Sequence, residues 1–445
     1  MTGLTEGDLF RGLVAVAAPI VAGNVLQSVL EMVDLFFVGR LGYEAIAGVA
    51  MSSTIVMVLM TIIIGLVTAN TAFVSRHYGA RDLDMVAKAV YHTLILGLVF
   101  SIVLTAVGIL FAEDMLLFLG AEPDVAVLGA SYLAVLFAGI ATMVELWVIN
   151  SSFQSCGDAT TPMLLVVLAN ILNIVLDPLL IFGYGAVPAF GVAGAAYATV
   201  ISRGVAFAIA FALLLSGRTP IPFSLRTTFE GALARRLILV AVPNSVQSGL
   251  RSVTFMVMMA VVAVFGTAAI SAYGIVGRLE TVALMPGFGV ATATAVLVGQ
   301  NLGAGKPERA AQGVRLSALM NGGFMALVGV IFFFAAPSLI EIFDPSGTST
   351  EIGMSYMQTV APFYVFIAVA IVLGFALNGA GDTKRPMYAT LFSMVLFQVP
   401  LAYILPDLLG IGIIGVWLAV VCGAILQVGM LFSMYRRGTW KTAAI

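Results

Sequence analysis

Long apolar runs separated by short polar segments recur along the whole chain. A helix of about 20 apolar residues spans the hydrocarbon core of a bilayer. Spanning β-strands would alternate polar and apolar residues, and these runs do not. The pattern therefore predicts an all-α membrane protein with twelve transmembrane helices. We expect spans near residues 12–38, 45–70, 88–112, 127–152, 163–184, 191–216, 236–263, 267–294, 312–336, 355–377, 387–406 and 412–434.

The composition excludes most other classes. Of 445 residues, 61% are hydrophobic and only 9% are charged, whereas a soluble domain has about 25% charged residues. A soluble enzyme, a disulfide scaffold, a coiled coil and a disordered chain are therefore excluded. The net charge of −2 gives no indication of a nucleic-acid partner. We interpret Cys156 and Cys422 as structural, because their spacing fits neither a metal site nor a redox motif.

Basic residues mark one side of the predicted bundle. The even-numbered loops and both termini hold sixteen of the twenty Lys and Arg residues. Among basic residues the odd-numbered loops hold only Arg40, and they collect acids instead. Because cytoplasmic loops retain positive charge, we expect both termini to be cytoplasmic in a multi-pass protein of the cell inner (plasma) membrane. The amino terminus has acids where a cleavable signal has a basic region, so the first run is interpreted as a spanning helix.

The two halves of the chain repeat each other at an offset of 224 residues. At this offset Pro19 falls on Pro243, VSRHYGA at 74–80 falls on VGQNLGA at 298–304, and GDATTPM at 157–163 falls on GDTKRPM at 381–387. The longest hydrophilic connection divides the copies. We expect an amino-terminal six-helix lobe at 1–216, a cytoplasmic connecting loop at 217–235 and a carboxy-terminal six-helix lobe at 236–445.

The even number of spans in each half gives both copies the same orientation. The two lobes must then be related by a pseudo-twofold axis along the membrane normal, as in one class of secondary transporters. This arrangement favours transport by alternating access around a cavity between the lobes.

The paired VSRHYGARD and VGQNLGAGK blocks, the paired GD-x-x-x-P-M blocks and LNIVLDPLLIFG in the fifth helix resemble multidrug and toxic compound extrusion (MATE) transporters. The resemblance covers nearly the whole chain. It implies twelve helices in two lobes and cation-coupled export of amphipathic, often cationic, drugs. It implies no cofactor beyond the coupling ion, and we expect a monomer.

Charged groups inside spans are costly and mark functional sites. Asn173 precedes Asp177 by four positions and therefore shares its helix face. Counted inward from the outer loops, Asp34, Asp177 and Thr199 lie about 8–12 Å deep. We expect these four residues to form one cation site for a proton or a small hard cation such as Na⁺. The alternative is a network of buried hydrogen bonds.

The family resemblance implies the same four positions, because one branch uses an Asp, an Asn and Asp, and a Thr in the corresponding helices. The other branch uses acids in the carboxy-terminal lobe. Here the first of those positions falls on Arg251 and the second near Ile367. We therefore expect the second cation site to be absent.

Other intramembrane charges leave alternatives open. Glu280 is either functional or ion-paired with Arg278. Glu31 either faces Asp34 or turns to another helix. One of Glu145 and Trp147 faces either the lobe interior or a partner. Two further basic residues offer neutralisation of these acids: Arg203 and Arg251.

Prolines in two spans suggest hinges. Pro19 and Pro178 each remove a helical hydrogen bond, so kinks are expected beside the proposed site. The alternative is that these prolines serve only ordinary helix packing. The aromatic and methionine residues of the spans either line a drug cavity or face lipid and core: Phe36, Phe37, Met256, Met258 and Met259.

Three other functions compete with the interpretation as a gradient-driven drug transporter. A primary pump needs a phosphate loop, and GQNLGAGKP at 299–307 has the wrong glycine spacing and Pro after Lys. An enzyme is not expected, because the only histidines, His77 and His92, stand apart near the cytoplasmic side. The closest rival is a lipid or lipid-linked precursor flippase of the same wider superfamily. The sequence leaves open the substrate, the choice of H⁺ or Na⁺, and the face to which the resting state opens.

Overall fold

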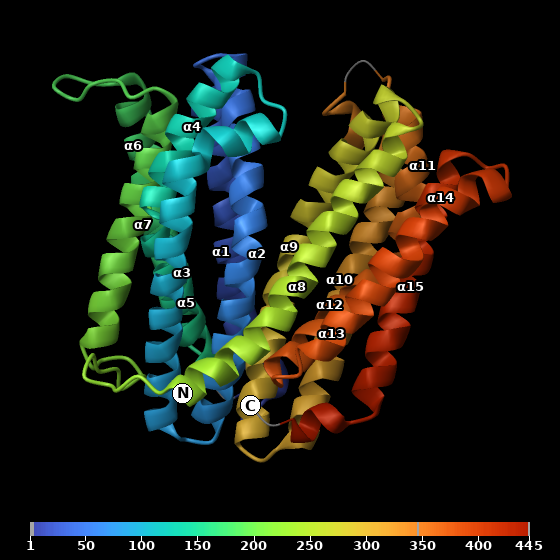
Figure 1. Cartoon of the computed structure of the whole chain (residues 1–445). Coiled ribbons are helices and arrows are strands. Elements are labelled where there is room, and N and C mark those ends of the chain that lie inside the picture. Colours follow the sequence, from blue (N-terminus) through green and yellow to red (C-terminus); the bar gives the residue numbers. More distant parts are fainter. Residues whose placement is uncertain (1–3, 345–346, 444–445) are drawn as a thin grey trace.

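The structure is a computed structural model that describes residues 4–344 and 347–443 (Figure 1). Within these ranges it is helical, with one isolated bridge between Tyr184 and Val187. The helices are α1 Leu9–Gly39, α2 Tyr43–Gly79, α3 Leu83–Phe118, α4 Pro123–Ala138, α5 Ile140–Ser155, α6 Thr160–Phe182, α7 Val192–Leu215, α8 Gly231–Ala263, α9 Thr267–Gly303, α10 Pro307–Glu341, α11 Thr350–Val360, α12 Tyr364–Gly379, α13 Lys384–Thr390, α14 Val399–Leu408 and α15 Ile413–Arg436, with short η1 Ala361–Phe363, η2 Leu391–Gln398 and η3 Thr439–Thr442.

The twelve predicted spans are confirmed in the described part of the chain. Eleven continuous helical segments are long and apolar enough to cross a membrane, and the pair α4 and α5 makes the twelfth. That pair bends by 50° at Gly139, where a Cβ atom would lie 2.3 Å from Val200 of α7. The bend lets one span follow the surface of its neighbour.

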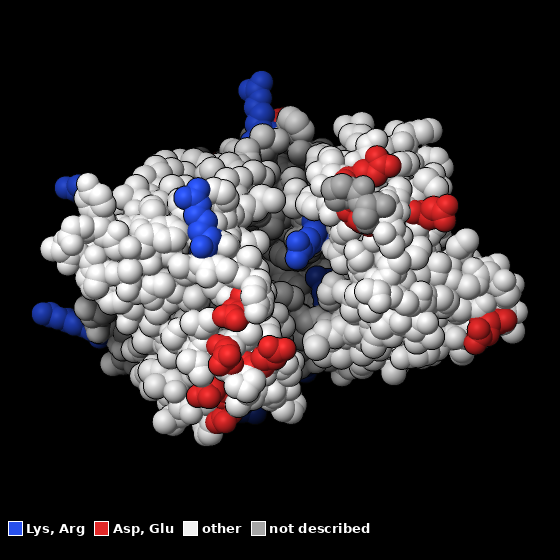
Figure 2. Space-filling view, turned by 90° about the horizontal axis from the view of Figure 1, so that it is seen from above, with Lys and Arg blue, Asp and Glu red and all other residues white. Residues whose placement is uncertain are grey.

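Two lobes form the molecule (Figure 1). Helices α1–α7 make the amino-terminal lobe and α8–α15 the carboxy-terminal lobe. The lobes meet on the side of the bundle where both described chain ends lie, here called the terminal side, and diverge toward the opposite side. Seen from that opposite side, a cleft runs between them (Figure 2).

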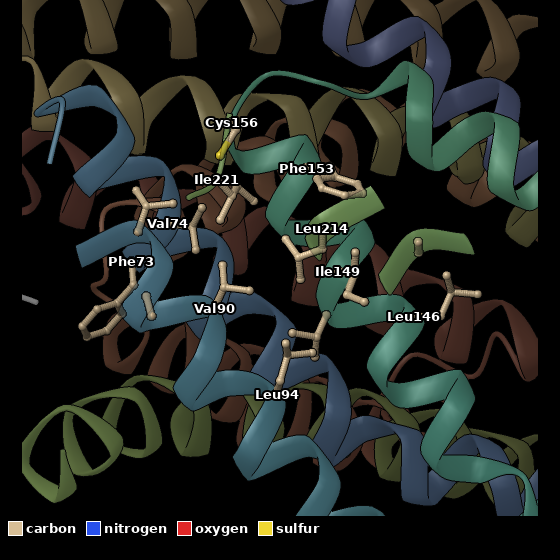
Figure 3. Packing of buried hydrophobic residues seen from close by; sticks show 14 of the residues in the cluster. Phe73, Val74, Val90, Leu94, Leu146, Ile149, Phe153, Cys156, Leu214 and Ile221 are labelled. Atoms are coloured by element: carbon tan, nitrogen blue, oxygen red, sulfur yellow. The ribbon is translucent and has the colours of Figure 1, made fainter. Parts of the chain in front are cut away.

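The amino-terminal lobe has a dense apolar core near the terminal side (Figure 3). Phe73 of α2, Val90 of α3, Ile149 of α5 and Leu214 of α7 are completely buried there. Ile221 from the segment between α7 and α8 is buried in the same cluster. This segment is therefore packed onto the lobe and is not a free tether.

The same connection is fixed at its far end by a histidine. The buried ring of His92 accepts a hydrogen bond through Nε2 from the backbone N–H of Glu230, at 2.6 Å, and stacks on Phe229 with ring centroids 5.0 Å apart. Lys88 adds an ion pair with Glu230 at 3.1 Å. Helix α8, which starts at Gly231, thus begins against α3 of the other lobe.

The repeated VSRHYGA and VGQNLGA blocks lie against each other across the pseudo-twofold axis. A Cβ atom on Gly79 would lie 1.9 Å from the carbonyl oxygen of Gln300, and one on Gly303 would lie 1.8 Å from that of Arg76. At the offset of 224, Gly79 corresponds to Gly303 and Arg76 to Gln300. Only glycine permits this reciprocal backbone approach.

A second reciprocal pair lies farther along the same helices. Gly65 of α2 packs on Ser245 of α8, where a Cβ would lie 2.0 Å from the serine Oγ. Its counterpart Gly289 of α9 packs on Val21 of α1, where a Cβ would lie 2.5 Å from the side chain. The two-lobed, pseudo-symmetric architecture is therefore built on glycines of the repeat.

The paired GD blocks begin the fifth span of each half. In the first half, Asp158 accepts from the backbone N–H of Thr161 at 3.0 Å and from its hydroxyl at 2.6 Å. In the second half, Asp382 forms an ion pair with Arg385. Burial raises the pKa of Asp382, and the Arg385 guanidinium opposes that rise. These acids stabilise helix starts outside the spans.

We predict that Gly79→Ala and Gly303→Ala disfavour the closed terminal side. Forcing a methyl group against backbone costs about 1–3 kcal/mol, which is roughly a 5-fold to 150-fold loss in population of the closed arrangement. Spin labels at exposed Asp84 and Arg437, on a background without native cysteines, should report longer distances. Gly323→Ala is the control, since a Cβ there meets nothing within 4 Å. Unchanged distances in both variants would contradict the role given to these glycines.

Candidate functional site

Three helices bring the four predicted residues together inside the amino-terminal lobe: Asp34 from α1, Asn173 and Asp177 from α6, and Thr199 from α7. Asn173 and Asp177 are completely buried and Thr199 is 9% exposed. Asp34 is half-buried. The structure therefore brings these four positions together around Asn173.

Asn173 connects the cluster. Its carboxamide orientation follows from its hydrogen bonds: Nδ2 donates to Asp34 Oδ1 at 2.7 Å, and Oδ1 accepts from the backbone N–H of Thr199 at 3.2 Å. The opposite orientation leaves longer contacts, 3.5 Å to Asp177 and 3.4 Å to the Thr199 hydroxyl. Asn173 thus links α1, α6 and α7.

Asn173 lies beside both carboxyl groups, which are close enough to influence each other. Asp177 Oδ2 is buried and has no hydrogen-bond partner among the described residues. Two neighbouring ionised carboxylates repel each other, so the pair needs a shared proton or a bridging cation. The cluster is therefore chemically suited to gain and lose one positive charge.

A sodium ion fits the donor set only after a change at Asn173. Carboxylate, carboxamide and hydroxyl oxygens are hard ligands, but the carboxamide here directs its nitrogen toward Asp34. Among the described residues no group of three or more His, Cys, Asp or Glu is arranged to hold a metal ion. Sodium would need the amide of Asn173 to turn its oxygen inward.

Local sequence explains the alignment. Asn173 and Asp177 are four residues apart on α6, which places them on one face. A tight connection through Gly183 and Gly191, both at positive φ, returns the chain as α7. Gly194 then lets α7 approach α6 so closely that a Cβ would lie 2.4 Å from the Leu180 carbonyl oxygen. This close hairpin sets Thr199 opposite Asn173.

Glu280 lies in the other lobe and does not pair with Arg278. Its Oε1 accepts hydrogen bonds from Tyr356 at 3.0 Å and Tyr364 at 2.8 Å. Tyr273 and Trp417 stack beside this group, with ring centroids 6.0 Å apart. The ion-pair interpretation of Glu280 is therefore wrong, and the residue belongs to an aromatic hydrogen-bonded cluster.

The open question at Glu145 and Trp147 is resolved. Glu145 is 6% exposed and faces α3, where a Cβ on Gly97 would lie 2.9 Å from its Oε1. Trp147 is 38% exposed and lines the cavity between the lobes. The side chain of Glu31, on α1, lies outside the part of the chain that the structure describes.

The prolines lie inside their helices. Pro19 and Pro178 are within α1 and α6, which continue past them. The residue after Pro19, Ile20, packs in a cluster with Val296 and Leu297 of α9. The Pro19 segment is thus part of the contact between the lobes, and its role as a hinge stays a prediction.

A cavity of about 450 Å³ lies between the lobes. Its lining includes Trp147, Phe288 and Phe375 and, from one face of α8, Asn244, Gln247, Ser248 and Arg251. The aromatic and methionine residues proposed from sequence do not line it: Met258 is in the carboxy-terminal core, Met259 and Phe37 pack on core clusters, and Phe36 and Met256 are more than half exposed.

Sequence reasoning missed most of the cavity, although a signal was present. In α8 the polar residues at 244, 247, 248 and 251 recur at helical spacing within an apolar span. That spacing places them on one face of α8. A polar face of a membrane helix is directed toward protein or water.

Comparisons with known proteins agree with this architecture. A sequence profile of the family described as MatE matches residues 19–179 and again 243–404, so its second match begins at the same offset as the internal repeat. The chain belongs to the MatE family. The family resemblance and the all-α, two-lobed fold are thereby confirmed, and the chain is a multi-pass membrane transporter of a multidrug efflux family.

Two relatives with different descriptions cover most of this MatE-family chain. The probable multidrug resistance protein NorM of Thermotoga maritima is 26% identical over 441 residues, with 98% of this chain and 94% of the relative covered. The FAD transporter of Shewanella oneidensis is 28% identical over 404 residues, with 90% and 89% covered.

Solved structures of transporters superpose over nearly the full length. One, described as "Reverse polarity of binding pocket suggests different function of a MOP superfamily transporter from Pyrococcus furiosus", has a TM-score of 0.91 at 25% identity, covering 99% of each chain. An outward-facing multidrug resistance MATE transporter has a TM-score of 0.90 at 26% identity, also covering 99% of each.

We predict that Asn173→Leu lowers the melting temperature in detergent, because Asp34 loses a hydrogen-bond donor inside the lobe at a cost of about 1–3 kcal/mol. The matched variant is Asn170→Leu, which removes a hydrogen bond from the same helix to the Leu26 carbonyl oxygen at 2.9 Å. Asn173→Leu should be the more destabilised of the two. An Asn173→Leu protein as stable as the wild type would show that the cluster is not connected as described.

Proposed function

We propose that this protein is a cation-coupled antiporter of the plasma membrane that exports small amphipathic molecules by alternating access, without enzymatic chemistry or a bound cofactor. The observation that carries the proposal is the pair of neighbouring carboxyl groups, Asp34 and Asp177, which both lie beside Asn173 inside one lobe. Transport needs an energy source, and this cluster can gain and lose a cation. The chain acts as a monomer, since each lobe supplies one half of the central cavity.

Coupling works through the lobes and not through direct contact of ion and substrate. Asp34, Asp177 and Thr199 do not line the central cavity. Helix α1 carries Asp34 near one end and, at Val21, touches Gly289 of the other lobe. Cation binding shifts the equilibrium between outward- and inward-open states only by its difference in affinity for the two. Helix α1 is the element that connects cation binding with the change between these two states.

The geometry favours a proton as the coupling ion. Two neighbouring carboxyl groups share one proton without rearrangement, and the amide nitrogen of Asn173 is directed at Asp34. Sodium requires that amide to turn. Sodium coupling is therefore the second candidate.

The distribution of charge supports cytoplasmic termini. Sixteen of twenty basic residues belong to the terminal-side loops and the chain ends, the side retained in the cytoplasm. Hydrogen bonds join the lobes there: Gln300 donates to the Ser155 carbonyl oxygen at 2.7 Å and Lys306 to that of Thr5 at 2.9 Å. The conformation described is then outward-open.

The substrate class follows from the cavity. Its apolar and aromatic walls suit amphipathic molecules, and one relative is named a multidrug resistance protein and another an FAD transporter. We therefore expect the protein to export several different amphipathic compounds and not a single drug. A lipid-linked precursor flippase is the alternative, and a flipping assay beside an efflux assay separates the two.

We predict that Asp34→Asn and Asp177→Asn each abolish gradient-driven export while the protein stays folded, because removing a buried charge does not itself destabilise a span. Efflux from proteoliposomes is measured with proton and sodium gradients imposed separately. Asp114→Asn, which replaces an exposed acid, is the control, and Glu280→Gln should be milder. Export that survives in either cluster variant would remove the site. Loss in Glu280→Gln alone would place coupling in the other lobe.

We also predict that α1 responds to the coupling cation. Spin labels at Arg11 and Val29, one on each side of Pro19 and about 27 Å apart along an ideal helix, should change distance with pH or Na⁺ in the wild type. The change should vanish in Asp34→Asn. If the distance across Pro19 responds identically in both proteins while the wild type transports, coupling through α1 is excluded. This holds even if the cation site itself is confirmed.

A further inference from the structure

We propose that the cavity between the lobes binds an amphipathic aromatic anion and that Arg251 holds its acidic group. The inference rests on the transport function proposed above and names its substrate class. The family resemblance implies substrates that are often cationic drugs. The cavity instead carries the positive charge of Arg251, which favours an anion.

Arg251 carries the only formal charge among the described residues that line the cavity. It is half-buried, and among the described residues it has no ion-pair or hydrogen-bond partner. Placing an unpaired guanidinium among apolar walls is costly. A phosphate, sulfonate or carboxylate would offset that cost, because a guanidinium binds such groups through two parallel hydrogen bonds.

Asn244 and Gln247, on the same face of α8 as Arg251, already form hydrogen bonds with each other and with neighbouring helices. Asn244 donates to Gln247 at 3.3 Å and accepts from Thr68 at 2.9 Å. Gln247 donates in turn to Thr390 at 3.2 Å. These bonds fix the amides in place, so the charged donor left for a ligand is Arg251.

A second polar atom points to a ligand independently. Asn378 lines the same cavity and is 4% exposed. Its Oδ1 has no hydrogen-bond partner within the described part of the chain. An unsatisfied buried acceptor costs about 1–3 kcal/mol. A ligand that donates an N–H or O–H here would satisfy it. The expected ligand thus combines an acidic group with a hydrogen-bond donor.

Aromatic side chains provide the surface for a planar ring system. Phe288 of α9 and Phe375 of α12 have ring centroids 6.2 Å apart, and both line the cavity with Trp147 of α5. Aromatic rings offer large contact area at low entropic cost. Stacking against these walls would orient the apolar part of the ligand while Arg251 holds the acid.

The charge is present in only one half of the repeat. At the offset of 224, Arg251 corresponds to Gln27, which is neutral. Basic side chains are visible inside the cleft, whereas the visible acidic side chains lie on the surfaces of the two lobes (Figure 2). A ligand in this pseudo-symmetric cavity therefore has one preferred orientation, with its acidic group toward α8.

The test compares two probes that differ by one anionic group, 8-anilinonaphthalene-1-sulfonate and neutral N-phenyl-1-naphthylamine. Binding to full-length protein in phosphatidylcholine nanodiscs is measured by titration calorimetry, with empty nanodiscs subtracted. Arg251→Gln should weaken binding of the sulfonate by tenfold to hundredfold, the range expected for a charge-assisted hydrogen bond. Arg251→Lys should retain more affinity than Arg251→Gln. The neutral probe should bind all three proteins alike.

Several outcomes would overturn the proposal. Equal losses for both probes in Arg251→Gln would mean that Arg251 is structural, and unchanged sulfonate binding would mean that it does not contact the ligand. Dihexanoyl phosphatidylglycerol that binds as tightly as the sulfonate, with the same dependence on Arg251, would replace an aromatic anion by a lipid headgroup. Tighter binding of ethidium, a cation, to the wild type than of the sulfonate would also overturn it.

Export assays and an exposed acid provide the remaining controls. Asp114→Asn replaces an acid outside both the cavity and the cation site, so it should bind the sulfonate as the wild type does. Retained export with Arg251-independent sulfonate binding would defeat this inference alone. Loss of the Asp34 effect on export, with Arg251-dependent binding intact, would defeat only the coupling proposal.

Discussion

The close approach of two backbones at the pseudo-twofold axis is the constraint on which the rest of the structure depends. Gly79 meets Gln300 and Gly303 meets Arg76, each at a separation that admits no Cβ atom. Gly65 and Gly289 repeat the same arrangement farther along the helices. Because the lobes are held together along this line on the terminal side, they diverge on the other side, and the central cavity lies where they separate.

The acidic cluster and the arginine of the cavity occupy different places. The acids Asp34 and Asp177 lie inside one lobe, packed among three helices, whereas Arg251 stands in the cavity shared by both lobes. Within a low-dielectric interior, neighbouring charges interact strongly. In the proposed mechanism, this separation allows the cluster to exchange a cation without direct competition from a substrate. Coupling then passes through movement of α1 against α9.

The carboxy-terminal lobe shows that symmetry of fold is not symmetry of chemistry. At the offset of 224, Asp34 corresponds to Met258 and Asp177 to Leu401, so the cation cluster has no copy there. Glu280 instead lies among tyrosines and accepts two hydroxyl hydrogen bonds. Those bonds satisfy a buried carboxyl group in place of an ion pair. The repeat thus preserves the glycines that shape the interface while each lobe carries its own polar groups.

The sequence by itself determined the spans, the repeat and the four residues of the cluster. Apolar run length, a fixed offset and the four-residue spacing of Asn173 and Asp177 are local or periodic properties, and helix geometry converts them directly into position. Only the tertiary structure decided that Glu280 meets Tyr356 and Tyr364 and that Glu145 turns toward Gly97 while Trp147 faces the cavity. It also decided that Arg251 has no partner among the described residues. Those facts depend on how each helix is rotated about its axis and which neighbour it meets. Packing between helices distant in sequence sets that rotation, and in a span that is apolar on most sides the hydrophobic pattern does not.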